Sequence, residues 1–266
     1  MKGLNRIRLG QHYPIASPVH SLDARVKILC ALGVLVAAFV VDRPGGVVLL
    51  LLFSLAAVYL AKLPPRQVLF SLRSVLVLLL ITGVAQLLFS PGREVASWGP
   101  VSITNTGIEN GVVYTLRLVT AVITLGVLTM ATSPVELLDG LEGLLSPLRL
   151  LGFPARETAM TLATAMRFLP LLVGRAADIS RAQEARGADF ASGNPLRKAR
   201  SLIPLLVPLF TTCFRDAQEL GAALASRGYR GGEGRTSYRA GRVGVAELGA
   251  LVVTALLIAV AVLFPA

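Results

Sequence analysis

Charged residues are scarce in this chain, and their scarcity excludes most soluble proteins. Only 15% of the 266 residues are Asp, Glu, Lys or Arg, whereas soluble domains carry about 25%. Hydrophobic residues make up 54% of the chain, and the mean hydropathy is +0.70. The composition therefore indicates a membrane protein before any motif is considered.

The chain also lacks the residue patterns that several kinds of chemistry require. Its two cysteines, Cys30 and Cys213, offer neither a disulfide framework nor the spacing of metal ligands. No G-x-x-x-x-G-K-[ST] loop occurs, so the usual loop for binding nucleotide phosphates is absent. The acidic residues stand singly among arginines, which argues against an integral-membrane enzyme. The sequence therefore predicts no catalytic residue, no metal and no cofactor.

Acidic residues are fewer than basic ones, 15 against 26. The formal net charge is +11 at pH 7, a balance that is also typical of nucleic-acid-binding proteins. Here the arginines lie between hydrophobic spans and are not interleaved with aromatic residues, which argues against nucleic acid. Anionic lipid of the bilayer or an acidic protein partner is the better interpretation.

Long hydrophobic runs are what the chain has instead. A helix needs roughly 17 to 25 mostly apolar residues to cross a bilayer, and five stretches approach that length: 26–41, 45–61, 68–89, 111–131 and 243–264. We therefore predict an all-α, polytopic membrane protein with about five transmembrane helices and long amphipathic cytoplasmic coupling helices. It divides into an N-terminal transmembrane region (1–132), a coupling-helix region (133–242) and a C-terminal transmembrane helix (243–266).

The distribution of Lys and Arg predicts the orientation of these spans. The N-terminal segment holds five, the next three connections hold one, three and one, and the region 133–242 holds fifteen. Because positive residues are retained in the cytoplasm, we expect the N-terminus and region 133–242 to face the interior of a prokaryotic cell. The first apolar run follows a basic segment, so we expect no cleavable signal peptide.

Two long amphipathic helices are expected in region 133–242. Ser133-Pro134-Val135-Glu136 predicts a capped start for a shorter helix that ends near 145. The long helices are expected over about 155–186 and 195–227. Three prolines fall inside them and should bend or interrupt them: Pro170, Pro204 and Pro208. That both helices simply lie on the membrane surface remains an alternative.

Each long helix is expected to end in a small residue, an arginine and a glycine. The two triplets are Ala185-Arg186-Gly187 and Ser226-Arg227-Gly228, 41 residues apart. A glycine just past the last turn ends a helix in the left-handed conformation, and the arginine before it lies at the negative end of the helix dipole. Its guanidinium suits a carboxylate or backbone acceptor on another protein. A plain structural cap explains one copy equally well but is the weaker explanation for two.

Three charges fall within or near the predicted spans, where charges are costly. Arg73 and Glu247 lie near the inner ends of their spans at similar depth, which favours an ion pair between them. Arg117 lies deeper in the fourth stretch, and the sequence names no partner for it. Sliding contacts with a second membrane subunit are the alternative to a structural role.

The chain resembles the T component of energy-coupling factor transporters, the prokaryotic importers of vitamins and transition metals. Three stretches carry the resemblance: 17–27, then 166–172 followed by 181–189, and 226–231. In that family, two Ala-Arg-Gly motifs dock into grooves on two ATPase subunits, which implies that Arg186 and Arg227 are the docking arginines. Ser226 departs from the family's alanine but is also small.

The resemblance implies a scaffold without chemistry of its own. Two cytoplasmic ATPase subunits would drive it, and a separate membrane subunit, the substrate-binding S component, would capture the vitamin or micronutrient. The cobalt or nickel importer version of the same subunit stays open, because it differs mainly in its partner. An integral-membrane enzyme and a membrane-anchored interaction protein are the alternatives from other classes. The substrate itself is not encoded in any motif of this chain.

Overall fold

The computed structural model describes residues 15, 17–91, 94–98, 101–145, 155–188, 201–229 and 244–263. Contacts between residues divide the chain into two units, which are described separately. One unit, here called the helical bundle, comprises Gly10–Leu144 and Arg239–Ala266. The other comprises Met1–Leu9 and Leu145–Tyr238 and is called the helix pair, after the two long helices described in it.

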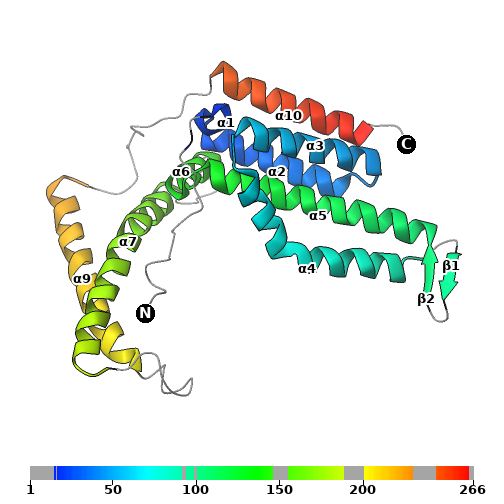
Figure 1. Ribbon diagram of the computed structural model, residues 1–266. Helices are drawn as coiled ribbons and strands as arrows, with labels where there is room; N and C mark the ends of the chain where they lie inside the picture. Colours follow the sequence, from blue (N-terminus) through cyan, green and yellow to red (C-terminus); the bar gives the residue numbers. More distant parts are fainter. Residues whose placement is uncertain are drawn as a thin grey trace. The chain divides into compact units, whose positions relative to one another are not determined.

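The helical bundle is built around one long helix, α5 (Asn105–Ala131), which packs against α2, α3 and α4, while α10 lies against α2 and α3 (Figure 1). Its other described elements are α1 (Pro18–Ser21), α2 (Ala24–Val40), α3 (Pro44–Leu60), α4 (Pro65–Phe89), β1 (Glu94–Trp98), β2 (Val101–Thr104), α6 (Pro134–Leu145) and α10 (Val245–Leu263). Each of the five predicted apolar stretches is a helix here: α2, α3, α4, α5 and α10.

Three of these helices, α4, α5 and α10, are long and apolar enough to cross a membrane, and α3 is a shorter apolar helix. Side chains on the outside of the bundle agree with a lipid surrounding, because large apolar residues such as Leu69, Phe70 and Val77 are exposed on α4. Contiguous exposed apolar surface of this kind is rare on soluble proteins. The predicted all-α membrane fold is therefore confirmed, and five spans remain a prediction.

Local sequence signals fix where the bundle helices begin. Asp23 caps α2 by accepting a hydrogen bond from the amide of Arg25 at 2.9 Å. At α6 the predicted capping box is confirmed: the amide of Glu136 donates to Oγ of Ser133 at 3.2 Å, and the amide of Ser133 donates to Oε2 of Glu136 at 3.1 Å. These contacts satisfy amides that a helix start leaves unpaired.

Small residues allow the bundle helices to approach closely. The main buried cluster combines α2, α3, α5 and α10 and consists of Val34, Ala37, Ala38, Val41, Val47, Leu50, Val113 and Ala261. Alanines and glycines at helix contacts bring backbones together, which is how helices pack in membranes, where the hydrophobic effect does not drive association.

A short hairpin between α4 and α5 was not predicted. Strands β1 and β2 pair antiparallel, with Ser97 opposite Ser102 and an irregularity between Glu94 and Ala96. The sequence indicated only a connection rich in Gly, Ser and Thr at this place. The hairpin is the one departure from helix among the described elements.

The helix pair consists, where it is described, of α7 (Ala155–Ala185) and α9 (Ile203–Ser226). The predicted helix over 155–186 is thus confirmed, and α7 continues through Pro170 without a break. Of the predicted second helix over 195–227, the part from 201 on is described: Ser201 is helical, Leu202 is a turn residue, and α9 follows from Ile203. Residues 189–200 lie outside the described residues, so the predicted start at 195 stays a prediction. Pro204 occupies the first turn of α9, where a missing amide costs nothing, and the helix is interrupted at Leu202 just before it.

Close packing in the bundle yields a matched pair of glycine substitutions. A Cβ on Gly46 would lie 2.5 Å from the carbonyl oxygen of Ala261, whereas one on Gly126 would meet nothing within 4 Å. We expect Gly46→Ala to lower the free energy of unfolding by about 1–3 kcal/mol through overpacking. Gly126→Ala should leave it unchanged or raise it by up to about 1 kcal/mol. Thermal unfolding in detergent compares the two, and equal effects would contradict the α3–α10 contact.

Candidate functional site

The tip of α7 is closed by a Schellman motif. The amide of Ala188 donates to the carbonyl of Gln183 at 2.9 Å, and the amide of Gly187 donates to the carbonyl of Glu184 at 2.9 Å. Gly187 has φ +92°, a conformation in which a Cβ would crowd the following carbonyl. The motif satisfies carbonyls that the last turn leaves unpaired.

The tip of α9 repeats this geometry. The amide of Tyr229 donates to the carbonyl of Leu224 at 3.0 Å, the amide of Gly228 donates to the carbonyl of Ala225 at 3.0 Å, and Gly228 has φ +72°. Oγ of Ser226 donates to the carbonyl of Ala223 at 2.9 Å within the same helix. The hydroxyl of Ser226 is therefore hydrogen-bonded within its own helix. The prediction that a left-handed glycine ends each helix is confirmed.

Both tip arginines are exposed. Arg186 and Arg227 present guanidinium groups that make no hydrogen bond or ion pair with any described residue. Arg181, one turn before the tip of α7, differs, because its Nη2 lies 2.5 Å from Oδ1 of Asp178. The flanking residues of both triplets are exposed and small: Ala185, Gly187, Ser226 and Gly228. The two arginines thus remain available to groups outside the described chain.

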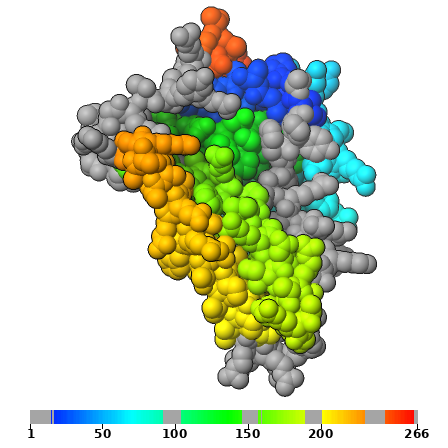
Figure 2. Space-filling model, turned by 90° about the vertical axis from the view of Figure 1, so that its left-hand side faces the viewer, coloured from blue at the N-terminus to red at the C-terminus, as the bar shows by residue number. Residues whose placement is uncertain are grey.

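The two helices run antiparallel, so their arginine tips lie at opposite ends of the helix pair (Figure 1). Figure 2 shows the yellow α9 lying along the light-green α7. An ion pair between Arg175 and Asp216 joins them, with 32% and 15% of the two side chains exposed. Arg186 lies eleven residues beyond Arg175, and Arg227 lies eleven residues beyond Asp216. At 1.5 Å per residue, each tip is about 16 Å along its helix from the ion pair.

The surface of α9 carries an apolar stripe that the sequence did not reveal. Helical spacing in the sequence places Leu202 and Leu206 on the same face as Leu209, Cys213, Leu220 and Leu224. The structure leaves Leu202 and Leu206 exposed and the other four half-buried. The exposed stripe follows helical spacing and comprises Ile203, Leu206, Val207, Phe210 and Phe214. The helix has two apolar sides, and residue spacing alone does not identify which side packs inward.

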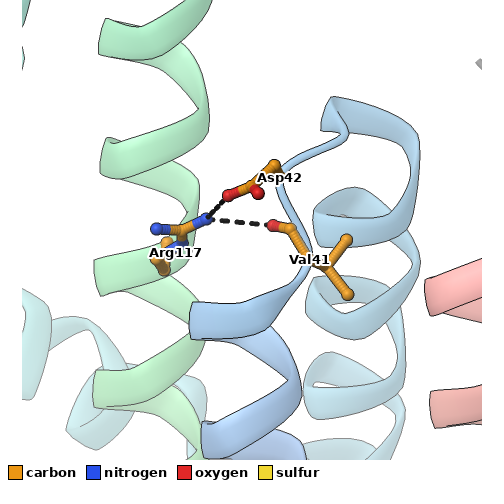
Figure 3. A network of polar contacts seen from close by, with 3 residues as sticks. All are labelled: Val41, Asp42 and Arg117. Atoms are coloured by element: carbon orange, nitrogen blue, oxygen red, sulfur yellow. Dashed lines mark hydrogen bonds and ion pairs between the residues drawn. The ribbon is translucent and has the colours of Figure 1, made fainter.

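Arg117 is buried in the bundle, and the structure supplies the partners that the sequence did not. Its Nη2 donates to the carbonyl of Val41 at 2.9 Å and to Oδ1 of Asp42 at 3.3 Å (Figure 3). The guanidinium carbon lies 4.9 Å from the ring centroid of Tyr114 and 5.8 Å from that of Phe39, within the range of cation–π attraction. Arg117 therefore fixes the end of α2 to α5.

The predicted ion pair between Arg73 and Glu247 is absent. Glu247 accepts a hydrogen bond at its Oε2 from the amide of Gly244 at 2.9 Å, because it stands in the first turn of α10, where unpaired amides attract carboxylates. Arg73 is exposed on α4 and has no partner among the described residues. Similar depth in a membrane does not make two residues neighbours.

Arg117 is buried and Arg73 is exposed, so substitutions of the two should differ in their effect on stability. We expect Arg117→Met to lower the free energy of unfolding by about 1.5–3 kcal/mol, because charge-assisted hydrogen bonds of this kind contribute that much. Arg73→Met removes the same charge from an exposed position and should be nearly neutral. Unfolding of both variants in detergent decides the matter; an Arg117→Met protein as stable as Arg73→Met contradicts the structural role.

The Arg175–Asp216 ion pair is open to a charge-swap cycle. Arg175→Asp or Asp216→Arg alone places like charges opposite each other and should loosen the helix pair, raising amide hydrogen exchange in α9. The double variant restores an opposite pair, and we expect a coupling of about 0.5–3 kcal/mol between the two positions. Additive effects of the two substitutions would show that the contact does not join the helices.

Known proteins share this sequence along nearly its whole length. The CbiQ family, described as cobalt transport protein, matches residues 16–238. The chain is 41% identical over 254 residues to the energy-coupling factor transporter transmembrane protein EcfT of Thermosediminibacter oceani, covering 96% of each chain. It is 42% identical over 233 residues to the protein of the same name from Acidaminococcus fermentans, covering 88% of this chain and 87% of that one. The chain therefore belongs to the CbiQ family and is a transmembrane component of energy-coupling factor transporters.

Proposed function

We propose that this transporter component is the coupling subunit between two cytoplasmic ATPase subunits and a substrate-binding S component. The observation that carries the proposal is the pair of helix tips: each has an exposed arginine that pairs with no described residue and that is followed by the same glycine cap. A guanidinium at an exposed helix end is well suited to bidentate contact with a carboxylate or with backbone carbonyls of a partner. One tip serves each ATPase subunit.

The proposed orientation follows from the positive charge of the chain. Fifteen Lys and Arg residues lie in region 133–242, which therefore faces the cytoplasm together with the N-terminus, and the spans cross the inner membrane of a prokaryotic cell. In this orientation the tips reach soluble ATPase subunits. The chain itself is a transporter component and not an enzyme, so ATP is bound and hydrolysed by its partners.

The proposed mechanism uses the helix pair as a lever. Because the tips lie at opposite ends of an antiparallel pair, ATP-driven approach of two ATPase subunits moves them relative to each other. The Arg175–Asp216 ion pair, at equal distance from both, keeps α7 and α9 in contact during this motion. The exposed apolar stripe on α9, centred on Phe210 and Phe214, offers the S component a surface that the motion displaces.

The transported substrate divides the proposal into two versions. The family resemblance implies uptake of a vitamin or another micronutrient. The description of the matching family, cobalt transport protein, favours cobalt or nickel as the second candidate. Uptake of radiolabelled cobalt and of labelled vitamins into vesicles that carry the co-purified subunits and ATP distinguishes the two.

Charge reversal at both tips tests the docking. We expect Arg186→Glu with Arg227→Glu to abolish co-purification of the ATPase subunits, because each carboxylate would repel the acceptors that a guanidinium binds. Arg181→Glu with Arg215→Glu is the matched control: it changes the same charge at exposed positions of the same two helices and should retain the subunits. Intact co-purification with the tip variant, or equal loss with the control, would overturn the docking role.

A further inference from the structure

A cavity of about 280 Å³ lies within the helical bundle, between α2, α3, α5 and α10. Small residues leave the space that larger ones would fill; among them are Ala31, Ala57, Ala131 and Ala250. The lining extends along α2 from Lys27 to Val34, which is about 10 Å of helix. This cavity is called the slot below.

The slot is apolar although three hydroxyl residues line it. Oγ of Ser54 donates to the carbonyl of Leu50 at 2.9 Å and lies 3.0 Å from Oγ1 of Thr124. Oγ1 of Thr254 donates to the carbonyl of Ala250 at 2.8 Å. These hydroxyls are already paired, so little in the deeper part of the slot attracts water, and apolar cavities of this kind bind apolar molecules.

The slot opens to the outer surface of the bundle. Leu60 and Val253 belong to its lining and are nevertheless 52% and 56% exposed. In a membrane protein, apolar surface on the outside of a helical bundle faces lipid. The molecule nearest to this opening is therefore a phospholipid, whose acyl chain matches the polarity of the slot.

One lining residue carries a positive charge. Lys27 is only 7% exposed, and its Nζ donates to the carbonyl of His20 at 2.9 Å and to that of Ala131 at 3.2 Å. An ammonium group has three N–H donors, and no described residue accepts the third. Asp23 and Glu136 are near enough to interact with its charge, and the N–H that no described residue accepts is left for an anionic group joined to a hydrocarbon chain.

We propose that the slot binds one acyl chain of an anionic phospholipid, whose phosphate accepts the remaining N–H of Lys27. The depth of the headgroup rests on the proposed orientation, which places the start of α2 at the cytoplasmic face of the membrane. Anionic lipids supply the negative surface of that leaflet. The bound chain fills the space between α2, α3, α5 and α10 and supports the contacts of α10 with α2 and α3.

Photo-cross-linking of the full-length chain in vesicles tests the site. The probes are phosphatidylglycerol and phosphatidylcholine that carry the same diazirine-labelled acyl chain, and mass spectrometry maps the attached peptides. We expect phosphatidylglycerol to label peptides of the slot, around Phe53, Val127 and Val253, and phosphatidylcholine to label them more weakly. Labelling confined to the outward face of α4, or equal labelling by both lipids, overturns the proposal.

Two matched substitutions on α10 separate the slot from the outer surface. Ala250→Leu fills the slot and should remove most of the labelling there, whereas Ala255→Leu makes the same change at an exposed position outside the lining and should leave it intact. Slot labelling that survives Ala250→Leu contradicts the site, as does cross-linking of the slot to another protein subunit in place of lipid.

The contribution of Lys27 is measured separately. Lys27→Met keeps the length of the side chain and should reduce phosphatidylglycerol labelling to the level of phosphatidylcholine, whereas Lys27→Arg should retain the difference. An unchanged preference in Lys27→Met overturns the headgroup contact. Retention of the ATPase subunits reports on the tip arginines and not on this slot, so failure of one proposal is distinguishable from failure of the other.

Discussion

Carbonyl groups at the C-terminal ends of helices need hydrogen-bond donors. The donors that pair with them determine how the helix tips and the buried cations of this protein are arranged. At α7 and α9, the amides after Arg186 and Arg227 turn back to close the last turn, which requires the positive φ of Gly187 and Gly228. The guanidinium groups are thereby spared from capping their own helices. Their donors are left for the proposed partner subunits.

In the helical bundle, buried cations perform the same task. Arg117 donates to the carbonyl of Val41, which follows α2, and Lys27 donates to the carbonyl of Ala131, the last residue of α5. Two residues that look like costly charges in an apolar sequence are therefore helix-end partners. In a lipid environment an unpaired carbonyl costs several kcal/mol. Each cation therefore offsets part of the free-energy cost of its own burial by donating a hydrogen bond to a backbone carbonyl.

Local signals in the sequence predicted most of the helices and both glycine caps, because these depend on residues within a few positions of one another. The capping box at Ser133 and the left-handed Gly187 and Gly228 are examples. Contacts between distant segments were not predictable in this way: hydropathy gives the depth of Arg73 and Glu247 but not which helices are neighbours. The slot and the second apolar side of α9 depend on packing, which residue spacing does not specify.

Helical phase adds a constraint to the tips. Eleven residues amount to about three full turns, so each tip arginine leaves its helix on nearly the same side as the ion-pair residue behind it. A single residue inserted between Asp216 and Arg227 would rotate that arginine by about 100° around the axis while leaving every side chain of the motif unchanged. The number of residues in this interval is therefore as much a part of the proposed docking element as the arginine itself.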